Sequence, residues 1–262
     1  MRADPVSVST RFYDAIAAEF RQSGGELGDA IQQSAAQWQA MLSCYSRDIR
    51  ILDCACGSGG DTLGIAMAGY EVVGSDASRA MLAEARKKRK ELGLSARFYH
   101  VAWRELPHKI RMRFDLVICG NNSFPHAVTD EEMLASLKGM FSVLREGGVC
   151  RIAWSHPDVY GKPGETRVVP PALTVQRKKG RKELHFEVWE VNEDVVTQSL
   201  FRIAKCRRGW VTRVASAPLR RLWPETMEML MGSAGFSHIQ ITESIHPMTK
   251  QLSGYRALGE KV

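Results

Sequence analysis

The chain has 262 residues, of which 44% are hydrophobic and 25% charged, so it is long enough for one α/β domain with an insertion. No run approaches the roughly 18–20 apolar residues of a membrane-spanning helix. The first residues lack the basic and then apolar pattern of a secretion signal, so we expect a cytoplasmic protein. Six scattered cysteines without a CxxC pair argue against a disulfide framework or a zinc site.

The formal net charge of +7 is compatible with a nucleic-acid partner or an anionic substrate. The excess of basic residues is concentrated in short runs at 86–90, 177–182 and 207–208. Such runs are more typical of solvated helix ends and hairpin turns.

Apolar spacing predicts two helices, at about 9–21 (Phe12, Ile16, Phe20) and 28–44, ahead of the first strand. A capping box of Thr129 and Glu132 begins a helix over 129–144, and Gly147-Gly148 is its predicted stop. Five apolar strands alternate with amphipathic segments, which predicts a mostly parallel, doubly wound sheet. The strands are expected at 51–54, 71–75, 97–101, 114–119 and 149–153.

The alternation stops after residue 160, and short β-prone runs with basic turns over 165–215 predict an antiparallel insertion. A helix at 224–230 and closing strands near 238–243 and 252–258 follow. We therefore divide the chain into N-terminal helices that cover the cofactor site (1–48), the cofactor-binding core (49–160), a β-rich lid insertion (161–218), and a closing helix with two strands (219–262).

A glycine-rich turn, Cys56-Gly57-Ser58-Gly59, joins the first strand to a helix, where backbone N–H groups can approach a ligand. The third glycine of a dinucleotide fingerprint is replaced by Thr62, which argues against NAD. Asp76 ends the second strand, where a carboxylate can accept hydrogen bonds from ribose hydroxyls and would repel an NADP phosphate. The alternative is that Asp76 caps the next helix beside Ser78.

Three stretches, DCACGSGGDTL, VGSDASRAML and VICGNNSFPH, with Ala102-Trp103 between them, resemble class I S-adenosylmethionine-dependent methyltransferases and, within them, the glycine/sarcosine N-methyltransferase group. The resemblance implies a Rossmann-like α/β fold with a seven-stranded, mostly parallel sheet. It also implies S-adenosylmethionine as cofactor and S-adenosylhomocysteine as product. The cofactor-binding residues that it implies are Tyr13, Ala55, Gly57, Gly59, Asp76, Ala77, Met81, Ala102, Trp103 and Gly120.

By the same resemblance, Asn122 and His126 belong to the acceptor and cofactor pocket, although Asn122 and Ser123 are also typical of a turn that bonds its own backbone. Tyr13 would close over the cofactor; the alternative is an ordinary aromatic residue of an amphipathic helix. The chain departs from the family at Ser155, where the family has an arginine that binds the substrate carboxylate. Glycine is therefore a poor candidate acceptor.

Methyl transfer needs alignment, exclusion of water and a free lone pair on the nucleophile. We expect Asn122 to orient the acceptor, and His126, His156 and Tyr13 are the candidates to take its proton. Trp154, His156 and Trp189 are further candidates for substrate binding. With the lid aromatics Phe186, Phe201 and Trp210, they favour a flat, weakly charged N-heterocycle or phenol, unless these side chains form a hydrophobic core instead.

Three functions compete. The first is N-methylation of a small amine or N-heterocycle in secondary metabolism, the second is small-molecule O-methylation, and the third is methylation of RNA or protein. The third lacks an NPPY-like tetrapeptide at 121–124, where the sequence reads Asn-Asn-Ser-Phe. A non-enzymatic module that binds the cofactor is a fourth reading. No metal cluster or membrane partner is expected, and we expect a monomer or dimer.

Overall fold

The computed structural model describes residues 5–17, 25–178, 181–207, 209–245 and 252–262. Its central element is a seven-stranded sheet in the order β10-β11-β5-β4-β1-β2-β3, which confirms the predicted α/β fold class. Neighbouring strands from β5 to β3 are parallel, and β11 and β10 are antiparallel. The strands are β1 (Arg50–Asp53), β2 (Glu71–Asp76), β3 (Arg97–His100), β4 (Phe114–Cys119), β5 (Leu144–Ser155), β10 (Ser237–Ile245) and β11 (Leu252–Glu260).

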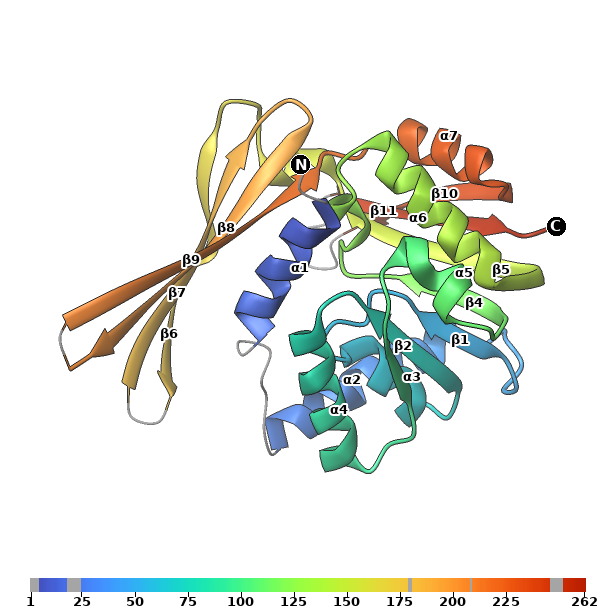
Figure 1. Cartoon of the computed structure of the whole chain (residues 1–262), viewed down its shortest axis with the longest axis horizontal. Coiled ribbons are helices and arrows are strands. Elements are labelled where there is room, and N and C mark those ends of the chain that lie inside the picture. Colours follow the sequence, from blue (N-terminus) through green and yellow to red (C-terminus); the bar gives the residue numbers. More distant parts are fainter. Residues whose placement is uncertain (1–4, 18–24, 179–180, 208, 246–251) are drawn as a thin grey trace.

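Helices cover both faces of this sheet (Figure 1). One face buries Ile51 and Leu116 under α2 and α3, and the other buries Leu52 and Val117 under α6 and α7. The opposite faces follow from the alternation of side chains along each strand. The helices are α1 (Pro5–Ile16), α2 (Gly25–Met41), α3 (Gly60–Met67), α4 (Arg79–Leu92), α5 (Leu106–Lys109), α6 (Asp130–Val143) and α7 (Pro224–Ala234).

The helix predicted over 129–144 is α6, and its N-terminus is capped as expected. The Thr129 hydroxyl accepts from the N–H of Glu132, whose carboxylate accepts from the N–H of Val128. The predicted glycine stop is wrong, because α6 ends at Val143 and Gly147-Gly148 lies inside β5. A Cβ on Gly148 would lie 3.0 Å from the Phe114 carbonyl oxygen, so close strand packing accounts for this glycine.

The predicted insertion is a separate antiparallel sheet in the order β6-β7-β8-β9, called the lid sheet below. Its strands are β6 (Thr166–Lys178), β7 (Arg181–Val191), β8 (Val195–Cys206) and β9 (Gly209–Arg220). Figure 1 shows α1 between the lid sheet and the rest of the chain. Leu200 and Ala217 of the lid sheet pack against Phe12 and Ile16 of α1, so the N-terminal helix joins the lid sheet to the core.

Several sequence predictions lie outside the described residues: positions 18–21 of the first predicted helix, with Phe20, and parts of the basic runs at 179–180 and 208. The basic run at 86–90 lies in α4, and Lys88 there is buried and donates to Ser58. None of the helices in the described part of the chain is long and apolar enough to cross a membrane.

Candidate active site

The end of β1 and the turn after it form the floor of the candidate site. Gly57 and Gly59 have φ angles of 50° and 87°, a left-handed conformation that glycine adopts without strain. Asp53 is buried, and its carboxylate accepts a 2.7 Å hydrogen bond from the Thr62 hydroxyl. Burial, together with the Asp61 carboxylate nearby, raises the pKa of Asp53 to about 7.

Asp76 at the end of β2 is bound to the glycine turn. One carboxylate oxygen accepts the N–H of Gly57 and the other the N–H of Ser78, both at 2.8 Å. Burial raises the pKa of Asp76. Ser78, rather than Asp76, is the residue that caps α4, since its hydroxyl accepts from the N–H of Met81. Each carboxylate oxygen has lone pairs left for the hydroxyls of a ligand.

A cavity of about 530 Å³ opens above these residues, within the range of ~300–1,000 Å³ that small-molecule sites occupy. It contains nine of the predicted site residues: Tyr13, Ala55, Gly57, Asp76, Ala77, Met81, Ala102, Trp103 and His126. Gly59, Gly120 and Asn122 are not in its lining, although their neighbours Gly60, Asn121 and Ser123 are.

Five acidic side chains, Asp53, Asp61, Asp76, Glu131 and Glu132, and one basic side chain, Arg104, line this cavity. The excess of negative charge suits a cationic ligand such as a sulfonium compound and opposes a pyrophosphate. A Cβ added to Gly57 would contact nothing within 4 Å, so the turn faces open space that a ligand can fill. The residues present therefore fit S-adenosylmethionine.

Asp61 was not among the residues that we predicted from the sequence. It lies in the first turn of α3, and its carboxylate accepts from the Trp38 indole at 2.9 Å and the Asn121 amide at 2.8 Å. Its position at the helix N-terminus after the glycine turn was a signal, but its partners come from α2 and the loop after β4, which the sequence alone does not bring together.

The Trp103 side chain lines the cavity. Its N–H donates to the Cys54 carbonyl at 2.8 Å, and its ring lies 5.9 Å from the Phe124 ring. On the other side, Gly139 of α6 contacts the Trp103 backbone so closely that a Cβ there would overlap the carbonyl oxygen. Trp103 is therefore fixed in position from three sides.

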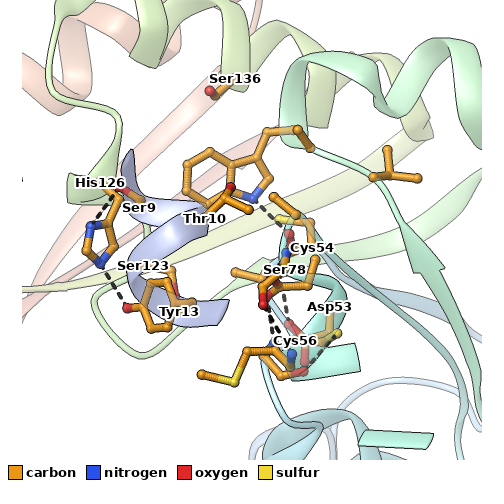
Figure 2. A pocket seen from close by; sticks show the side chains of 18 of the residues that line it. Ser9, Thr10, Tyr13, Asp53, Cys54, Cys56, Ser78, Ser123, His126 and Ser136 are labelled. Carbon is orange, nitrogen blue, oxygen red and sulfur yellow. Dashed lines mark hydrogen bonds between the residues drawn. The ribbon is translucent and has the colours of Figure 1, made fainter. Parts of the chain in front are cut away.

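Tyr13 and His126 meet at the opposite end of the cavity from Asp53 (Figure 2). The Tyr13 hydroxyl is 2.8 Å from His126 Nε2, and His126 Nδ1 is 3.1 Å from the Pro218 carbonyl oxygen of β9. A carbonyl oxygen can only accept, so Nδ1 carries the proton and Nε2 accepts from Tyr13. Burial lowers the pKa of His126 to about 4, which keeps this imidazole neutral near pH 7. Burial raises the pKa of Tyr13.

Asn122 has a φ of 59° and connects the loop after β4 to two other segments. Its amide oxygen accepts the Ser155 N–H at 2.9 Å, and its amide nitrogen donates to the Tyr160 hydroxyl at 2.8 Å. The side chain therefore bonds β5 and Tyr160 rather than its own backbone.

Trp154, His156 and Trp189 do not line the cavity. Trp154 is only 3% exposed, packed in the core with its N–H on the Leu222 carbonyl. His156 packs against Trp223 and Tyr255, at ring distances of 5.6 and 5.2 Å. Trp189 packs against Tyr160 at 5.2 Å.

The aromatic residues of the lid sheet also lie differently from the expectation. Phe186 and Phe201 stack on each other directly across β7 and β8. Because side chains alternate along a strand, they are on the opposite face from Leu200, which packs on α1. Trp210 is 53% exposed. The inference of a stacked aromatic acceptor therefore loses most of its support.

The sheet order, the glycine turn after β1 and the carboxylate after β2 together define the fold of class I S-adenosylmethionine-dependent methyltransferases, which confirms the resemblance seen in the sequence. More particularly, residues 51–148 match the methyltransferase domain family. The glycine/sarcosine N-methyltransferase of Aphanothece halophytica is 35% identical over 147 residues, which are 50% of this chain and 56% of that protein.

The cypemycin N-terminal methyltransferase of Streptomyces is 32% identical over 114 residues, covering 44% of this chain and 45% of that protein. The chain thus spans about half the length of these two curated relatives. Among solved structures, an amino pentose methyltransferase from Micromonospora echinaspora matches with a TM-score of 0.67 and 20% identity, over 94% of this chain and 95% of that one. A sugar N-methyltransferase from Streptoalloteichus matches with a TM-score of 0.69 and 17% identity, over 93% and 91%. These likenesses to solved structures show the fold, and the sequence matches show similarity to proteins named as methyltransferases.

Proposed function

We propose that this chain transfers a methyl group from S-adenosylmethionine to an amine nitrogen of a small molecule. The observation that carries the proposal is one cavity whose lining includes the carboxylates after β1 and β2 and also the Tyr13–His126 pair. The curated relatives named as glycine/sarcosine N-methyltransferases, and the solved structure of a sugar N-methyltransferase, support nitrogen as the acceptor atom.

In this proposal Asp76 binds the ribose hydroxyls, the turn at Gly57 lies along the methionyl part, and Trp103 contacts the adenine. When bound, S-adenosylmethionine supplies an electrophilic methyl group. The chain's own contribution is to bind, align and exclude water, which are the effects that such a displacement requires.

Tyr13 and His126 have distinct parts in the proposal. Because the neutral His126 accepts the Tyr13 O–H, the phenol oxygen is left with lone pairs that can accept an N–H of the acceptor amine. That bond would orient the nitrogen lone pair. His126 is then a positioning residue for Tyr13, and its Nε2 is already occupied.

The cofactor assignment is tested by calorimetric titration with S-adenosylmethionine, S-adenosylhomocysteine and NAD. Both adenosyl ligands are expected to bind, and NAD is not. Asp76→Ala is expected to weaken their binding about 10- to 100-fold, through loss of two hydroxyl bonds to a charged group. Asp76→Asn keeps the size of the side chain but offers one carbonyl oxygen to the two N–H donors of Gly57 and Ser78. Thermal unfolding of both variants therefore separates loss of ligand binding from loss of folding, and the exposed Asp29→Ala on α2 is the control. NAD binding, or binding unaffected at Asp76, would contradict the proposal.

A further inference from the structure

One face of the lid sheet is turned toward the core. Leu200 on this face packs on α1, and Trp189 packs on Tyr160. Glu187 lies directly opposite Leu200 in the strand register and two residues before Trp189, so its side chain is on the same face. Glu187 therefore lies between α1, which carries Tyr13, and Tyr160, which binds Asn122.

The Glu187 carboxylate is half-buried and has only neutral partners. Its Oε2 accepts from the Gln198 amide at 2.9 Å and from the Trp189 indole at 3.3 Å. Within the described ranges it has no ion pair with a basic side chain. Arg202, a cation on the same face, is bound to Glu183 with both distances at 2.8 Å. Neutral donors leave the negative charge of this carboxylate uncompensated, so the position suits a cationic ligand group.

Glu187 lies outside the lining of the cavity, and one further observation places it near Tyr13, which is in that lining. The negative charge of Glu187 contributes, after burial and Asp76, to the raised pKa of Tyr13, so its field reaches the phenol. The same face of the lid sheet also carries Arg167 and Arg213, which lie opposite Trp189 and Arg202 in the strand register, so a cation would be bound by Glu187 itself and not by a negative surface around it.

We propose that Glu187, held by Gln198 and Trp189, binds the ammonium group of the acceptor, so that the substrates are cationic amines without a carboxylate beside the amine. The bound ammonium group must release one proton to water before methyl transfer, because only the neutral amine has the lone pair that attacks the methyl group. This inference rests on the proposed function and specifies its substrate class. A carboxylate of an amino acid at this place would be repelled by Glu187, whereas an amine, an amino sugar or a similar cation would be attracted.

The test uses amines matched to their carboxylated counterparts: histamine and histidine, tyramine and tyrosine, N-methylethanolamine and sarcosine. Each is titrated calorimetrically into the protein saturated with S-adenosylhomocysteine. We expect the carboxylate-free member of a pair to bind more tightly. Glu187→Gln is expected to weaken binding of the carboxylate-free amine about tenfold or more, and so to narrow the difference in affinity between the two members of a pair. The control is Glu190→Gln, because Glu190 is exposed on the opposite face of β7. It is expected to change neither the affinity for the amines nor the difference in affinity within a pair.

Thermal unfolding and S-adenosylhomocysteine affinity of Glu187→Gln should match the wild type, which separates loss of recognition from loss of folding. Gln198→Ala removes one donor to the Glu187 carboxylate but keeps the negative charge. This variant should still bind the carboxylate-free amine more tightly than its carboxylated counterpart, and should lose less affinity for the amine than Glu187→Gln does. A preference for the amino acids, a preference insensitive to Glu187→Gln, or no binding of any amine would each overturn the inference. Failure of S-adenosylhomocysteine to bind would instead overturn the proposed function.

Discussion

The free energy of unfolding of the wild type is expected to fall as the pH rises, because Asp53 must lose its proton, and replacing Asp53 with asparagine should abolish this fall. Burial, with Asp61 nearby, raises the pKa of Asp53 from 3.8 to about 7, so the folded chain holds this proton more tightly than the unfolded chain. The resulting stabilisation is fully present below about pH 4 and is lost as the pH rises through about 7. An interval of about 3 pH units at about 1.4 kcal/mol each corresponds to about 4 kcal/mol at pH 8.

The assay is urea unfolding of the ligand-free protein at pH 5 and pH 8. Between these values the free energy of unfolding of the wild type should fall by about 3 kcal/mol more than that of Asp53→Asn, which keeps an acceptor for the Thr62 hydroxyl. Asp29→Asn, at an exposed position on α2, should follow the wild type. Equal pH dependence of the wild type and Asp53→Asn would refute the reasoning.

Two more predictions concern His126 and the packing around Trp103. Burial lowers the pKa of His126 from 6.5 to about 4, so its neutral form stabilises the fold above pH 6.5 and this contribution falls by about 3 kcal/mol by pH 4. In urea unfolding at pH 4.5 and 7, the free energy of unfolding of His126→Asn should therefore fall less toward acid pH than that of the wild type. An equal fall in both proteins would contradict this prediction. Gly139→Ala should destabilise by about 1–3 kcal/mol, because its Cβ meets the Trp103 carbonyl. Gly28→Ala, with nothing within 4 Å, should be neutral or gain up to about 1 kcal/mol, and equal effects at both glycines would count against the packing argument.

Much of the cofactor end of the site could be read from the sequence because its signals are local. The glycine turn follows β1 within a few residues, and Asp76 lies 19 residues beyond Gly57, at the end of the neighbouring parallel strand. Because β1 and β2 are parallel, their carboxyl ends, and with them the glycine turn and Asp76, lie at the same edge of the sheet. Locality also explains why the cap at Thr129 was predicted correctly.

The acceptor end was less predictable because it is assembled from distant segments. Tyr13 and His126 are 113 residues apart, and His126 and Pro218 are 92 apart. The glycine stop at Gly147 failed for a related reason: pairing of β5 with β4 already begins at Leu144, so a tertiary contact ended the helix earlier than the local signal.

By itself, the sequence determined the order of strands and helices along the chain, the glycine turn after the first strand and the presence of an antiparallel insertion. Each of these follows from periodicity or from residues close along the chain. Only the tertiary structure decided which aromatic residues face the site. Alternation along a strand shows that two faces exist, but what covers each face depends on packing, which buried Trp154 in the core, turned Phe186 away from α1, and left Glu187 facing it.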